Sequence, residues 1–111
     1  MISTHVLDTS TGRPAAGVNL RLAVQRDDEW HELVRAATDA DGRVARLLPI
    51  GAALAAGLYR LTFEVGSYFR RLGIDSFYSD VTVEFIVRDP DTHHHVPLLV
   101  SPYGYSTYRG S

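Results

Sequence analysis

Hydrophobic and polar residues alternate along most of the chain, which is the pattern of strands that bury one face. The clearest runs with this period are residues 18–25, 59–65 and 81–88, with a less regular run at 30–38 and a shorter one at 4–8. We expect two further strands on either side of a turn at residues 101–104. Short strands at this spacing predict an all-β sandwich or barrel.

Stretches rich in Asp, Gly, Pro and Ser separate these runs. One of them, residues 39–42, has the sequence Asp-Ala-Asp-Gly, which predicts a tight turn because Asp tolerates turn geometry and Gly adopts a positive φ. Residues 67–73 break the alternation. They predict a short helix with Ser67 as its N-cap and Gly73 as its C-terminal stop.

The size and composition of the chain indicate a single globular domain over residues 1–111. Of these residues, 45% are hydrophobic and 22% are charged, which is an ordinary balance for a folded domain. There is no cysteine, so disulfides, thiolate metal sites and a cysteine nucleophile are excluded. The basic residues are all arginine, which excludes a Schiff-base lysine and a P-loop lysine.

Charge and hydropathy restrict the possible partners and location. Eleven basic residues against 13 acidic ones give a net charge of −2, so we do not expect nucleic acid as a partner. The longest mainly apolar run, residues 47–58, is interrupted by Pro and Gly and is too short to span a membrane. The first residues show no signal peptide, so we expect a cytoplasmic location.

Histidines are the first candidates for chemistry. In an extended strand, His93 and His95 point to one face and His94 to the other. Such a His-x-His pair could bind zinc, but no spacing singles out a third ligand, so metal binding, catalysis and an ordinary surface cluster all stay open. His5, in the first strand, is either a structural residue or a general base, since histidine titrates near neutral pH.

Arginine and hydroxyl groups complete the set of candidates. Arg43 directly follows the turn at 39–42 and is either a solvated charge or a fork that grips an electron-rich oxygen. Residues 105–111 (Tyr-Ser-Thr-Tyr-Arg-Gly-Ser) are rich in hydroxyls and end the chain with an arginine, a serine and a free carboxylate. No Gly-x-Ser-x-Gly motif is present, so a serine-hydrolase fold is not indicated.

Four segments together resemble the 5-hydroxyisourate hydrolase (transthyretin-related) family. They are Thr-His-Val-Leu-Asp at 4–8 with Gly-Arg-Pro-Ala at 12–15, Thr-Asp-Ala-Asp-Gly-Arg at 38–43, His-Val-Pro-Leu-Leu at 95–99, and the C-terminal stretch 101–111. The final Tyr-Arg-Gly-Ser is the most specific element, because hormone-carrying transthyretins lack it together with the two histidines and the arginine. His94 departs from the resemblance, since this family commonly has tyrosine there.

The resemblance implies a fold, an assembly and a reaction. The fold would be a transthyretin-like β-sandwich of two four-stranded sheets with one short helix. The assembly would be a homotetramer, a dimer of dimers with active sites in the channel between dimers. The reaction would be hydrolysis of the small-molecule substrate 5-hydroxyisourate to 2-oxo-4-hydroxy-4-carboxy-5-ureidoimidazoline, on the route from urate to allantoin, without metal or cofactor.

The same resemblance implies the site residues. His5, Arg43, His95 and Ser111 would be catalytic, and Tyr108, Arg109 and Gly110 would bind substrate. We therefore expect the side chains of His5, Arg43 and His95 to line one pocket. The alternatives are a non-enzymatic module that binds a small aromatic ligand, a structural sandwich without a site, and a metal-dependent hydrolase.

Overall fold

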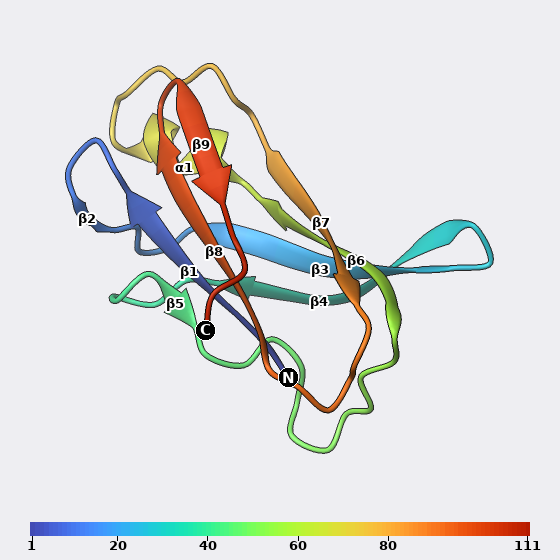
Figure 1. Cartoon of the computed structure of the whole chain (residues 1–111). Helices are drawn as coiled ribbons and strands as arrows, with labels where there is room; N and C mark the ends of the chain where they lie inside the picture. Colours follow the sequence, from blue (N-terminus) through green and yellow to red (C-terminus); the bar gives the residue numbers. More distant parts are fainter.

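Two β-sheets pack face to face in a computed structural model that describes all residues, 1–111 (Figure 1). The first sheet contains β1 (Ile2–Asp8), β2 (Arg13–Pro14), β5 (Arg43–Val44), β8 (His94–Ser101) and β9 (Gly104–Thr107). The second contains β3 (Asn19–Arg26), β4 (Glu29–Ala37), β6 (Gly57–Phe63) and β7 (Val81–Val87). The predicted all-β sandwich is confirmed.

The strand order differs in detail from two four-stranded sheets. The second sheet has four strands in the order β4-β3-β6-β7, as expected. The first has the order β2-β1-β8-β9, and β5 also pairs with β1, which makes five strands. The difference arises because β2 and β5 are only two residues long and flank the same strand.

The core lies between the sheets and follows from the alternation in the sequence. Twenty buried hydrophobic residues form one cluster, in which Tyr59, Phe63 and Phe69 are the largest fully buried side chains. Burying a large apolar side chain contributes about 1.5–3 kcal/mol. The inward-facing residues of each strand therefore hold the two sheets together and leave the outward-facing residues free for other roles.

Helix α1 (Val65–Arg71) begins two residues before the predicted start. The N-cap is Glu64, without a side-chain hydrogen bond, so the predicted N-cap at Ser67 is wrong. The reason is the spacing of the residues that α1 buries: Val65, Tyr68 and Phe69 face the core, which forces the helix to begin at Val65. Gly73 follows the helix with φ of 71°, as the sequence predicts. At seven residues, α1 is not long enough to cross a membrane.

Strands β1 and β8 pair in parallel and bring the two ends of the sequence together. Their register places Ser3 opposite His95 and His5 opposite Pro97. Figure 1 shows the blue first strand beside the red last strands, with the C-terminal segment passing over the sheet. This pairing positions the candidate site.

Candidate active site

The outer face of the first sheet carries the catalytic candidates. Because side chains alternate along a strand, Ser3 and His5 of β1 point to the same face as His95 of β8. His5 and His95 are both partly buried, and Ser3 is only 5% exposed. Two imidazoles and a buried hydroxyl therefore share one surface.

The predicted tight turn at residues 39–42 places Arg43 beside His5. Gly42 has φ of 72°, and a Cβ there would lie 2.5 Å from the backbone oxygen of Val6. The Asp39 side chain accepts a hydrogen bond from the Arg43 N–H at 3.0 Å, which fixes the turn. As a result β5 pairs with β1, and Arg43 is the direct register partner of His5. Only glycine at position 42 permits this approach.

A single hydroxyl connects His93 and His95. The Ser3 Oγ atom lies 2.7 Å from His93 Nε2 and 2.8 Å from His95 Nδ1. The two imidazole centroids are 6.3 Å apart. His93 and His95 therefore share a face, as the alternation predicts, and His95 Nε2 is the nitrogen of that ring left for chemistry.

The C-terminal segment returns to His95 after β9 ends. The antiparallel pairing of β8 with β9 ends at Leu98 and Thr107. The residue that precedes Leu98 in β8 is Pro97, which has no N–H to donate to the following residue of the C-terminal segment. Pairing resumes where the Gly110 N–H donates to the His95 carbonyl oxygen at 2.8 Å. A Cβ on Gly110 would lie 2.3 Å from His95 Cδ2, so the absence of a side chain lets the backbone lie against the imidazole.

The outer face of the first sheet has a depression of about 330 Å³. It is lined by Arg43, His95 and Ser111 together with Ser3, Thr4, His93, Met1 and Ala45. His5 is the register partner of Arg43 but is not among the lining residues, so only Arg43 and His95 of the three predicted residues line this depression. The structure thus brings His5, Arg43, His95 and Ser111 together although they are spread over the whole chain.

The electrostatics of the depression keep both imidazoles neutral. Burial is the main cause that lowers the pKa of His95, and the positive charge of Arg43 adds to it. Burial and Arg43 also lower the pKa of His5, against a smaller opposing effect of a hydrogen bond to the Asp41 backbone. At neutral pH each ring therefore has a free lone pair that can accept a proton.

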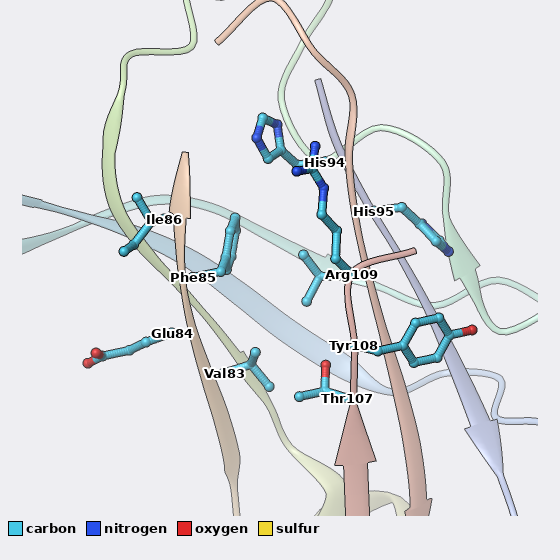
Figure 2. A pocket seen from close by; sticks show the side chains of 10 residues that line it. Val83, Glu84, Phe85, Ile86, His94, His95, Thr107, Tyr108 and Arg109 are labelled. Carbon is cyan, nitrogen blue, oxygen red and sulfur yellow. The ribbon is translucent and has the colours of Figure 1, made fainter. Parts of the chain in front are cut away.

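Arg109 lies apart from this depression in the single chain. Figure 2 shows its side chain reaching toward His94, whereas His95 and Tyr108 point the other way. Arg109, Tyr108 and His94 line a second depression, of about 230 Å³, between β7 and the end of β9. His94 itself is 6% exposed, on the opposite face from His95, and its Nδ1 has no hydrogen-bond partner.

Sequence reasoning did not identify Ser3, and for His93 it left metal binding, catalysis and an ordinary surface cluster open. The alternation of β1 already placed Ser3 on the face of His5, so a signal was present. The sequence did not indicate which strand pairs with β1, because a parallel pairing between positions more than 90 residues apart produces no pattern in the local sequence. No group of three or more His, Asp or Glu side chains in the structure has an arrangement that could hold a metal ion.

Comparison with known proteins decides the family. A family model described as the HIUase/Transthyretin family matches residues 2–110. This chain belongs to that family. Among its relatives, the 5-hydroxyisourate hydrolase of Salmonella typhimurium is 47% identical over 111 residues, which cover 100% of this chain and 81% of the relative. That of Caulobacter vibrioides is 48% identical over 114 residues, covering 99% and 97% of the two chains.

Solved structures of the HIUase/Transthyretin family share the fold. The 5-hydroxyisourate hydrolase of Klebsiella pneumoniae has a TM-score of 0.85 and 44% identity, covering 99% of this chain and 98% of that one. Sea bream transthyretin in complex with thyroxine has a TM-score of 0.90 but 28% identity, covering 98% and 93%. The two structures are both similar to this chain in backbone, so the fold alone does not distinguish between them.

Proposed function

We propose that this chain hydrolyses 5-hydroxyisourate to 2-oxo-4-hydroxy-4-carboxy-5-ureidoimidazoline, on the route from urate to allantoin. The observation that carries the proposal is the meeting of His5, Arg43 and His95 on one face of the first sheet. The 5-hydroxyisourate hydrolases that resemble the chain along its whole length support the choice of substrate.

The two histidines supply proton transfer. Ring opening begins when water attacks a cyclic amide carbonyl, and a base must remove a proton from that water. His5 and His95 are both neutral at neutral pH, because burial and Arg43 lower their pKa values. One imidazole accepts the proton of the water, and the protonated ring can then give a proton to the leaving ring nitrogen.

Arg43 supplies positive charge for the transition state. Attack on the carbonyl creates an oxyanion, and a positioned donor for such an oxygen is worth roughly 10²–10³ in rate. Arg43 forms no ion pair with a carboxylate, so its guanidinium is free for the substrate. Its planar fork suits the oxygen and imide groups of a purine-derived ring.

The C-terminal residues complete the site. In our proposal Ser111 borders the reacting groups, Gly110 allows the backbone to lie against His95, and Tyr108 contacts substrate from the same side. The substrate-binding role of Arg109 stays a prediction, because in the single chain its side chain reaches toward His94.

We further propose that the working form is a homotetramer, a dimer of dimers that covers this face. Arg43 and Ser111 are exposed in the single chain, and excluding water from an active site strengthens its electrostatics. The half-buried register partners Leu7 and Leu99 lie on the same face and offer apolar contact to another copy. Light scattering should give four times the 12.3 kDa chain mass, whereas a stable active monomer would contradict the proposal.

A carrier of small aromatic ligands is the second candidate, because the TM-score to sea bream transthyretin is as high as 0.90. The two candidates differ in turnover. Purified chain is mixed with freshly generated 5-hydroxyisourate, and the loss of ultraviolet absorbance is compared with the spontaneous rate. A hydrolase accelerates the loss at catalytic protein concentrations and yields a product heavier by one water, whereas a carrier only delays it.

A further inference from the structure

Ser3 has a position that the proposed reaction leaves unexplained. Its side chain is almost fully buried, and its single Oγ atom lies within hydrogen-bond distance of two imidazoles, at 2.7 Å from His93 Nε2 and 2.8 Å from His95 Nδ1. The parallel register of β1 and β8, with Ser3 opposite His95, holds it there. Both contacts are made to ring nitrogens, so both depend on where the ring protons lie.

A serine hydroxyl can donate one hydrogen bond through its O–H and can accept hydrogen bonds at its oxygen. When both histidines are neutral, Ser3 can donate to only one of them and must accept from the other. In the first arrangement, His95 Nδ1–H donates to Ser3, Ser3 donates to His93 Nε2, and His95 Nε2 keeps a lone pair. In the second, every donor is reversed and His95 Nε2 carries the proton. The tautomer of His95 is therefore tied to that of His93.

The charge distribution favours the first arrangement. Arg43 lies on the same depression as His95, and positive charge stabilises a lone pair at the open nitrogen, Nε2, over an N–H dipole. No Asp or Glu side chain lines this depression, and the carboxylate of Ser111 that borders it is offset by the amino group of Met1, which lines it as well. The first arrangement is also the one that leaves His95 ready to act as a base.

We propose that Ser3 and His93 are positioning residues that hold His95 as the Nδ1–H tautomer and carry its displaced proton away during the hydrolysis proposed above. As His95 Nε2 takes a proton from the attacking water, the Nδ1 proton passes to Ser3 Oγ. The hydroxyl proton of Ser3 then passes to His93 Nε2. One proton enters the relay and one arrives on His93, which becomes the cation while His95 stays neutral.

This transfer moves the positive charge from a partly buried imidazole, His95, to an exposed one, His93. A charged His95 would be partly buried beside Arg43, and both burial and that cation oppose its protonation. His93 is exposed, so water can solvate its charge while the proton is held there. When His95 Nε2 gives its proton to the leaving nitrogen, the relay runs backwards: His93 Nε2 returns a proton to Ser3 Oγ, and Ser3 passes its own to His95 Nδ1. His95 is then restored as the neutral Nδ1–H tautomer.

Nitrogen-15 NMR of the histidine rings in the whole chain tests the tautomer directly. At mildly alkaline pH, His95 should be the Nδ1–H form and His93 should accept at Nε2. In Ser3→Ala, His95 should shift toward the Nε2–H form that free histidine prefers, whereas Ser3→Thr, which keeps a hydroxyl, should restore the wild-type spectrum. Ser67→Ala, an exposed serine without a side-chain partner, is the control. An Nε2–H tautomer of His95 in the wild type, or no change in Ser3→Ala, would overturn the proposal.

Two substitutions of His93 separate orientation from proton transfer. The side-chain oxygen of His93→Gln can accept from Ser3 near the position of Nε2 but cannot take a proton, whereas His93→Phe can do neither. We expect His93→Gln to keep the His95 tautomer while kcat falls about tenfold with little change in KM, a smaller loss than the ~10⁴ that a wrong tautomer causes in serine proteases. His93→Phe should lose both tautomer and rate. Wild-type kcat in His93→Gln would refute the relay.

The spectroscopic result does not depend on the substrate. If the wild type fails to act on 5-hydroxyisourate but shows the predicted tautomers, the proposed function fails and the positioning by Ser3 stands. If the wild type is active and Ser3→Ala changes neither spectrum nor rate, the function stands and this inference fails.

Discussion

The outer faces of the two sheets use arginine in opposite ways. On the second sheet, Arg21 lies 3.7 Å from Glu64 and 3.4 Å from Asp80, and Arg60 lies 4.0 Å from the ring centroid of Trp30. On the first sheet, Arg43 has no carboxylate within ion-pair distance.

A guanidinium that has no carboxylate partner is available to bind a substrate. Exposed ion pairs add only about 0–1 kcal/mol to stability, but they occupy the guanidinium. Arg43 is left without such a partner, and its positive charge lowers the pKa values of His5 and His95. The same alternation builds both faces, and what marks the first as a site for an electron-rich substrate is an unpaired guanidinium that lies beside two imidazoles.

Removing Arg43 should have the largest effect. Arg43→Ala is expected to lower kcat/KM by roughly 10²–10³, because the developing oxyanion loses its donor. Its unfolding free energy should change by less than about 0.5 kcal/mol, as for other exposed side chains without partners. Steady-state kinetics and thermal unfolding measure the two quantities.

The matched control lies on the other face. Arg60→Ala removes a cation–π contact with Trp30 that is worth about 0.5–1 kcal/mol, so stability should fall while activity stays at the wild-type level. Equal losses of activity in Arg43→Ala and Arg60→Ala would contradict the claim that only the outer face of the first sheet takes part in the reaction.

A methyl group at Gly110 should have the next largest effect. Gly110→Ala places a Cβ 2.3 Å from His95 Cδ2, so the ring or the C-terminal segment must move. A small displacement of catalytic groups can cost as much as ~10² in rate, and we expect a loss between tenfold and that value. Gly104→Ala is the control, because its Cβ would meet only Ser101 Oγ at 3.8 Å, and its rate should be unchanged. Full activity in Gly110→Ala would show that the segment does not position His95.

The pH dependence should show a smaller effect of the same charge. The pKa values of His5 and His95 are lowered from 6.5, so both imidazoles are mostly neutral at pH 6.5. We therefore expect kcat/KM to rise with pH through a midpoint below 6.5 and then to level off. Arg43→Ala removes one of the lowering causes, and burial remains, so the pKa of each imidazole should move up toward 6.5. Titration of the ring protons by NMR measures both values, and a downward movement in the variant would contradict the electrostatic argument.

Chelation should have the smallest effect, which is none. The hydrolysis that we propose uses imidazoles and a guanidinium alone, so kcat and KM should be the same before and after treatment with EDTA. Loss of activity that zinc restores would favour the metal-dependent alternative.

Much of the fold could be predicted from the alternation, because each strand buries one face. Residues 81–88 were expected as a strand, and β7 spans Val81–Val87. The start of α1 was missed because the favourable capping chemistry of Ser67 competed with the burial of Val65, Tyr68 and Phe69, and burial is worth more.

The site was predictable only in part. The resemblance to a family pointed to His5, Arg43 and His95, and alternation alone placed His93 and His95 on one face. Ser3 was missed because its role depends on the parallel pairing of β1 with β8, which no local pattern indicates. The position of Arg109 depends on where the chain turns after Thr107, which Pro97 on the neighbouring strand determines.

The most direct test compares the initial rate of 5-hydroxyisourate loss in wild type, His5→Gln and His95→Gln, with the spontaneous rate subtracted. Glutamine keeps hydrogen bonding but cannot act as a base, and positioned acid–base catalysis contributes roughly 10²–10⁴. Our account predicts rapid loss with the wild type and at least a ~10² slower rate in each variant. A wild-type rate equal to the spontaneous one would contradict the function, and an active wild type with two fully active variants would contradict the site.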